Sequence, residues 1–82
     1  MAAFATLAMT ERLLDLRGLK CPLPVLRARK ALMASAPDNI LVVQCTDPLA
    51  VIDIPNLLRE TGDTLEQTSR NAQVTTFRIR KR

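Results

Sequence analysis

The apolar positions of this chain form short runs with the spacing of β-strands. Residues 40–45 are an apolar, largely β-branched run between turn residues, which is typical of a strand in the centre of a sheet. Residues 74–80 end in alternating apolar and basic side chains, as a half-buried strand does. Residues 13–17 predict a short first strand with Leu14 and Leu16 directed at the core.

A first helix is predicted over residues 22–35. Pro22 and Pro24 have no backbone N–H and fit only the first turn of a helix, where these groups have no intrahelical partner. The helix ends before a turn of Pro, Asp and Asn at residues 37–39. Cys21 therefore lies at or next to the N-cap, and Gly18 provides the bend after the first strand.

The apolar residues of this helix do not all fall on one face. Arg29 lies within an otherwise apolar surface, and helical periodicity leaves Leu23, Leu26 and Met33 outside the core stripe. Either Leu23 and Leu26 form an exposed rim where a partner docks, or the stripe is wide and Arg29 extends its charge out of it. The predicted core stripe consists of Pro24, Val25, Ala28, Leu32 and Ser35.

The second helical region contains a proline at position 55. Because proline disrupts a helix interior, we predict a turn at residues 48–52 and a helix over residues 53–61 with Asp53 as its N-cap. Gly62 is the expected C-terminal glycine.

The order of elements is β-α-β-α-β-β, with a polar strand at residues 63–70 before the last one. A right-handed crossover makes the first two strands parallel, and the last two form a hairpin. The predicted fold is an α/β (α+β) two-layer sandwich, a mixed four-stranded sheet with both helices on one face. Residues 11–82 form this single domain, and residues 1–10 are expected to be a flexible extension.

Composition excludes several classes of site. The chain has 82 residues and a net charge of +4, and it contains no histidine and only two aromatic residues, both Phe. Nucleophile–histidine pairs are therefore impossible, a metal site or other cofactor is not expected, and a base-stacking surface for nucleic acid is missing. No segment has the length of a membrane span, and the two cysteines form no CxxC, so we expect a reducing, cytoplasmic setting.

Cys21 is the candidate nucleophile. A helix N-terminus favours a thiolate, and no carboxylate occurs between Asp15 and Asp38 whereas five basic residues do. The alternative is a buried structural cysteine, which the position between loop and helix argues against. Partner contacts are expected from a basic rim, defined as Arg17, Lys20, Arg27 and Lys30, and from the apolar Leu23.

Cys45 has two possible roles. Its place at the end of an apolar run predicts a small core residue. However, both parallel strands end at the same edge of the sheet, so Cys45 could also lie near Cys21. We favour the core role.

The sequence resembles a known family, the TusA-type or SirA-like sulfur carriers. The segment 16–25 (LRGLKCPLPV) matches the family's signature around the CPxP motif. The pairs Arg29-Lys30 and Asp47-Pro48, the triplet at residues 53–55 and the closing strand at residues 77–81 also match. Leu23 and Asp63 depart from the residues that many members carry at these positions.

The resemblance implies that Cys21 accepts a persulfide sulfur from a cysteine desulfurase or another sulfurtransferase and passes it to an acceptor protein. The end product would be 2-thiouridine in tRNA, or that of another sulfur-transfer pathway. A small basic regulatory or RNA-binding module is the alternative, although we do not expect direct nucleic-acid binding. A thiol–disulfide oxidoreductase would need a resolving cysteine near Cys21. We expect a monomer that acts as a sulfurtransferase-type relay.

Overall fold

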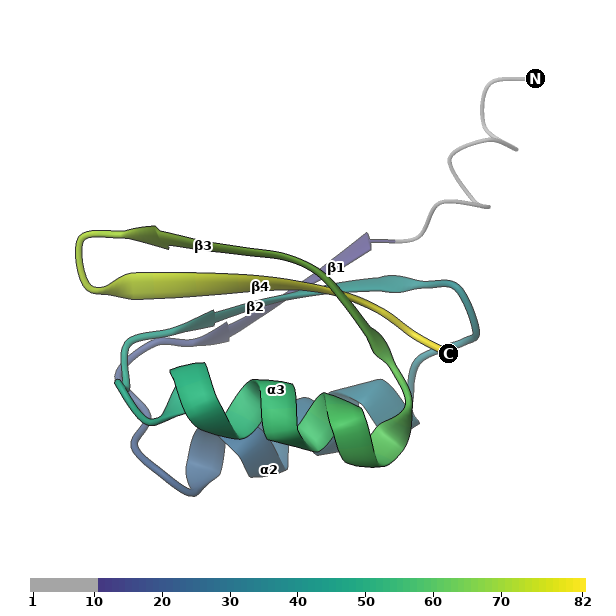
Figure 1. Ribbon diagram of the computed structural model, residues 1–82, viewed down its shortest axis with the longest axis horizontal. Coiled ribbons are helices and arrows are strands. Elements are labelled where there is room, and N and C mark those ends of the chain that lie inside the picture. Colours follow the sequence, from purple (N-terminus) through teal and green to yellow (C-terminus); the bar gives the residue numbers. More distant parts are fainter. Residues whose placement is uncertain (1–10) are drawn as a thin grey trace.

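The computed structural model describes residues 11–82 as a sheet with two helices packed against one of its faces (Figure 1). The predicted β-α-β-α-β-β order and the two-layer arrangement are confirmed. The predicted N-terminal extension lies outside the described residues. The elements are β1 (Glu11–Leu16), α2 (Leu23–Met33), β2 (Ile40–Cys45), α3 (Ala50–Thr61), β3 (Thr64–Asn71) and β4 (Val74–Arg80).

The sheet has the strand order β1-β2-β4-β3. β1 pairs with β2 in parallel, whereas β2–β4 and β3–β4 are antiparallel. The most apolar strand is therefore central, as predicted. The register sets Leu16 opposite Cys45, so β1 and β2 end side by side at one edge of the sheet.

Helix α2 resolves the choice between the two sequence interpretations. Leu23 and Leu26 are 43% and 53% exposed, and Arg29 reaches Glu60 of α3 at 3.8 Å. The apolar residues outside the stripe are therefore surface residues, which confirms the exposure in the first interpretation, and docking of a partner on them stays a prediction. The buried face consists of Pro24, Ala28, Ala31 and Leu32.

The start of α3 corrects a prediction. The helix begins at Ala50 and continues through Pro55, so there is no separate turn at residues 48–52 and Asp53 lies in the first turn instead of at the N-cap. Proline removes only the bond to the carbonyl of Val51, one turn earlier and on the exposed side. Burial of the apolar face of α3 offsets that loss. Gly62 ends the helix in the left-handed conformation, with φ 82°, as predicted.

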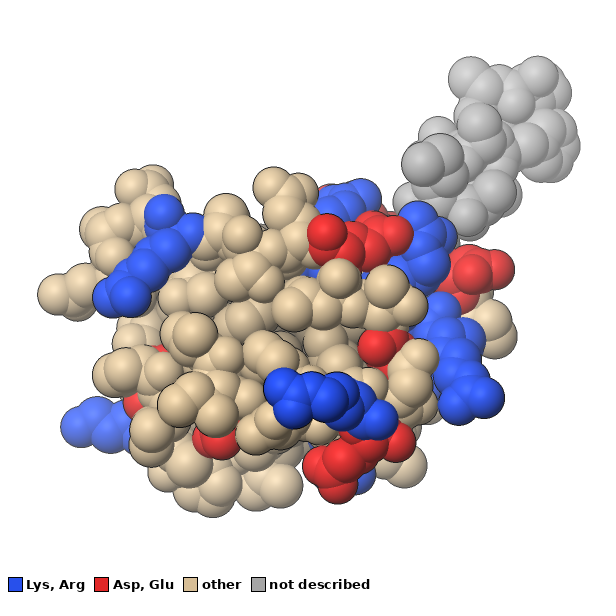
Figure 2. All heavy atoms as spheres, viewed as in Figure 1, with Lys and Arg blue, Asp and Glu red and all other residues tan. Residues whose placement is uncertain are grey.

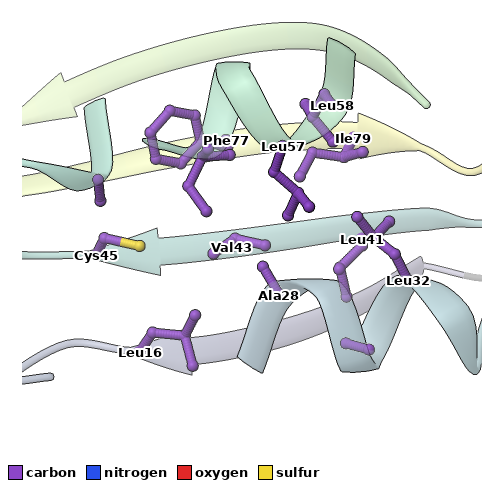
Figure 3. Close-up of a cluster of buried hydrophobic side chains, with 13 residues drawn as sticks. Leu16, Ala28, Leu32, Leu41, Val43, Cys45, Leu57, Leu58, Phe77 and Ile79 are labelled. Carbon is purple, nitrogen blue, oxygen red and sulfur yellow. The ribbon is translucent and has the colours of Figure 1, made fainter. Parts of the chain in front are cut away.

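The core lies between the helices and the sheet (Figure 3). Phe77 and Ile79 of β4 and Val43 of β2 are fully buried there, beneath Leu57 of α3. Cys45 is a free thiol with 0% exposure in the same cluster, which confirms the core role favoured from the sequence.

Asp63 is the buried polar residue that joins the C-terminal end of the chain to this layer. Its Oδ1 accepts the backbone N–H of Arg82 at 2.8 Å and lies 3.8 Å from Nζ of Lys81. The side chain is fully buried, so these contacts fix the residues after β4 against the junction of α3 and β3.

Two substitutions to alanine on α3 test this packing. Leu57→Ala removes a fully buried side chain and should lower the free energy of unfolding by about 2–5 kcal/mol. Ile52→Ala, on a residue that is 59% exposed, should change it by about 0.5 kcal/mol or less. Urea unfolding of both variants measures the difference, and equal losses would contradict the assigned faces of α3.

Candidate functional site

Cys21 lies where the loops that follow β1 and β2 meet. Because parallel strands end at the same edge of a sheet, the loop carrying Cys21 comes to lie beside residues 46–49. These two segments enclose a surface pocket of about 370 Å³. Its lining consists of Gly18, Leu19, Lys20, Cys21, Thr46, Asp47, Pro48 and Leu49.

Asp47 holds the two loops together. Its Oδ2 accepts the backbone N–H of Cys21 at 2.6 Å, and its Oδ1 accepts the N–H of Leu49 at 3.2 Å. The neighbouring Thr46 accepts the N–H of Gly18 through Oγ1 at 2.8 Å. Gly18 has φ 84°, a backbone conformation that suits glycine, and so forms the predicted bend.

The thiol of Cys21 is exposed and faces a carboxylate. It donates a hydrogen bond to Oδ2 of Asp53, in the first turn of α3, at 3.5 Å. Local desolvation, this hydrogen bond and the negative charges of Asp53 and Asp47 together raise the pKa of Cys21 above its ordinary value. The prediction of a thiolate favoured by its surroundings is therefore wrong for the free protein.

That prediction failed for two physical reasons. Pro22 is the N-cap of α2 and Pro24 is in its first turn, so neither supplies an N–H to a thiolate, and the N–H of Leu23 is already bonded to the carbonyl of Lys20. In addition, the carboxylates that face the thiol lie 26 and 32 residues further along the chain. Residues 16–37 contain no carboxylate, but the fold brings the carboxylates of Asp47 and Asp53 to Cys21 from later in the sequence.

The residues of the basic rim and Leu23, all predicted to contact a partner, occupy different positions. Lys20 lines the pocket of Cys21, and Leu23 lies at the start of α2. Arg17 is already paired with Asp15 at 2.8 Å. Arg27 and Lys30 are exposed on α2, and the ion pairs found within residues 11–82 include neither of them.

Sequence reasoning missed an apolar contribution from the second helical region. Leu49 lines the pocket and is 50% exposed, and Val51 and Ile52 follow it on the surface. Figure 2 shows charged side chains separated by wide uncharged areas on the face that carries α3. The available signal is the three apolar residues that follow Pro48, which are predicted from the sequence to lie in a turn at residues 48–52.

The described part of the chain contains neither a membrane-spanning helix nor a set of metal ligands. No helix among these residues is long and apolar enough to cross a membrane. No group of three or more cysteine, histidine or acidic side chains comes together there as a set of metal ligands.

Comparison with known proteins identifies the family. The sulfurtransferase TusA family matches residues 12–81. The chain belongs to this family. The sulfur-carrier role expected from the sequence is thereby confirmed at the level of the family.

Individual relatives agree with this assignment. The sulfur carrier protein TusA of Allochromatium vinosum is 40% identical over 68 residues, which cover 83% of this chain and 90% of that protein. A Neisseria meningitidis protein, whose name places it among candidate sulfur carriers, is 42% identical over 84% of this chain and 93% of its own length. The crystal structure of a SirA-like protein from Desulfitobacterium hafniense has the same fold, with a TM-score of 0.74 at 23% identity, covering 84% of this chain and 95% of that one.

The two thiols should differ sharply in alkylation of the native protein. Cys21 is exposed and should react with iodoacetamide, more slowly at pH 7 than a free cysteine and faster as the pH rises, because its raised pKa keeps the thiolate fraction small. Burial, and to a lesser extent the charge of Asp47, raises the pKa of Cys45 to about 11, so Cys45 should react only after unfolding. Peptide mass spectrometry after timed labelling measures both rates, and early labelling of Cys45 would contradict its burial.

Proposed function

We propose that this protein carries sulfur as a persulfide on Cys21. The observation that supports the proposal is the exposed thiol at the pocket between the two loops, in a chain whose other cysteine is fully buried. Membership of the TusA family supports the same role, and Cys21 occupies the cysteine of the CPxP motif.

The transfer is an exchange between sulfur atoms. The thiolate form of Cys21 attacks the outer sulfur of a donor's persulfide, the donor's S–S bond breaks, and the donor cysteine leaves as a thiolate that takes up the proton lost by Cys21. The carrier then holds one additional sulfur in a new S–S bond. The same exchange with an acceptor thiol returns Cys21 to its starting form, so no external oxidant or reductant is needed.

The partners in this proposal are enzymes with reactive cysteines. A cysteine desulfurase or another upstream sulfurtransferase supplies the sulfur, and a downstream acceptor protein uses it for 2-thiouridine in tRNA or in another sulfur-transfer pathway. Both cysteines are free thiols, which supports a reducing compartment such as the cytoplasm.

Direct RNA binding by the closing strand has less support. Arg78 pairs with Glu11 at 2.9 Å and with Glu66 at 3.5 Å, and Arg80 pairs with Glu66 at 2.7 Å. These arginines are therefore partly neutralised within the sheet, and the described residues include a single aromatic side chain, the buried Phe77. We do not propose a nucleic-acid function.

Loading by a cysteine desulfurase with free cysteine tests the assignment of Cys21. The protein should gain the mass of one sulfur atom, and reductant should remove it. Cys21→Ser should abolish the gain without unfolding the protein, because the residue is exposed and lies outside the core. Cys45→Ala should still load, and sulfur found on Cys45 in the Cys21→Ser protein would refute the proposal.

Reversing two charges of the rim tests its role in partner binding. Arg27→Glu with Lys30→Glu should slow sulfur acceptance several-fold at low salt, since rim charges act mainly on the association rate, and the effect should fade as salt is added. The control is Arg12→Glu with Arg59→Glu, which makes the same change in net charge on other exposed residues. Equal slowing in both pairs, or rates that do not depend on ionic strength, would contradict a specific rim.

A further inference from the structure

The carboxylate of Asp53 has no role in the exchange described above, although it is the side chain that the thiol contacts. We propose that Asp53 is a positioning residue that holds the proton on Cys21 in the unloaded carrier and so biases the carrier toward giving up its sulfur. This inference rests on the proposed function of Cys21. Its basis is the hydrogen bond of 3.5 Å from Sγ of Cys21 to Oδ2 of Asp53.

The fold fixes Asp53 in place beside the thiol. Asp53 is half-buried in the first turn of α3, and its own N–H is bonded to the carbonyl of Leu49 at 2.9 Å. The next residue, Ile54, is fully buried in the core, so packing holds the turn that carries Asp53 against the domain. On the other side, the bond from the N–H of Cys21 to Asp47 fixes the backbone that carries the thiol.

The charge on Asp53 is not compensated by an ion pair within the described residues. The ion pairs formed within residues 11–82 include neither Asp53 nor Asp47, although the protein carries a net charge of +4. The charged groups that surround the thiol are Asp53 from α3, Asp47 from the loop after β2, and Lys20, which lines the pocket from the loop before α2. The carboxylate of Asp53 thus contacts the sulfur, and the negative charge of Asp47 acts on it from the backbone side, in agreement with the raised pKa of Cys21.

Loading Cys21 with sulfur removes the hydrogen bond from its thiol to Asp53. The thiol has a proton to donate to Asp53, whereas the inner sulfur of a persulfide has none. The outer sulfur is anionic at neutral pH, because a persulfide is a stronger acid than a thiol. The loaded carrier thus exchanges a charge-assisted hydrogen bond for repulsion between two anions.

Asp53 therefore shifts the equilibrium of sulfur transfer away from the loaded carrier, and this shift is the same for every donor or acceptor. In the exchange of a sulfur atom between the carrier and an outside thiol, Asp53 stabilises the products that include the protonated Cys21 thiol. A carrier must release what it accepts, and this contact lowers the affinity of Cys21 for the transferred sulfur. Removing the charge should leave a carrier that loads more completely and releases less.

The test compares Asp53→Asn with the unsubstituted protein in equilibrium with glutathione and glutathione persulfide. Asn retains a hydrogen-bond acceptor but has no charge. The ratio of loaded to unloaded carrier, measured by intact-protein mass spectrometry at pH 7, should rise roughly fivefold or more, the effect of one unit charge about 4 Å away in water. The pH profile of alkylation by iodoacetamide should move to lower pH in the same variant.

The matched control is Asp38→Asn. Asp38 is exposed in the turn before β2, and its φ of 67° is one that Asn also adopts, so the variant makes the same charge change away from Cys21. Its loading ratio and alkylation profile should equal those of the unsubstituted protein. Urea unfolding shows that each variant remains folded.

Two results would overturn the proposal: an unchanged loading ratio in Asp53→Asn, or a change of the same size in Asp38→Asn. An unsubstituted protein that takes up no sulfur at all would instead refute the assignment of Cys21 as the carrier. In that case the alkylation profile still decides whether Asp53 holds the thiol proton, because it involves no sulfur transfer.

Discussion

Parallel pairing of β1 with β2 is the constraint from which the site follows. Leu16 and Cys45 end the two strands directly opposite each other, so the chain leaves the sheet twice at one edge. The hydrogen bond of 2.6 Å from the N–H of Cys21 to Asp47 then joins the loop after β1 to the loop after β2. Without this register, Cys21 would not lie beside Asp47 and Asp53, which are far from it in sequence.

Most of the fold could be predicted because its local signals agree with its tertiary packing. The apolar run at residues 40–45 coincides with β2, and Gly62 ends α3 in the left-handed conformation that favours glycine. The start of α3 could not be predicted from local rules. Pro55 is unfavourable inside a helix, but the buried residues Ala50 and Ile54 before it and Leu57 after it pack as one face only if the helix continues through the proline.

The sequence predicted the exposed position of the Cys21 thiol but not the charges that surround it. Two prolines and a glycine identify the exposed position of Cys21 from sequence alone. The charges around a thiol, however, depend on which segments meet in space. The signal that would have found Asp47 and Asp53 was present: both acidic motifs come shortly after a strand expected to be parallel to the first one, and therefore at the edge of the sheet where Cys21 lies.

The position of the second cysteine favours a sulfur carrier over a thiol–disulfide oxidoreductase. A thiol–disulfide enzyme resolves its intermediate by attack of a nearby thiolate. Here the only other cysteine is fully buried, and its pKa is raised to about 11, mainly by burial. Cys45 therefore cannot attack a sulfur bound to Cys21 without unfolding of the core. A persulfide on Cys21 would persist until a thiol from another molecule enters the pocket, which is the condition that a relay between two enzymes requires.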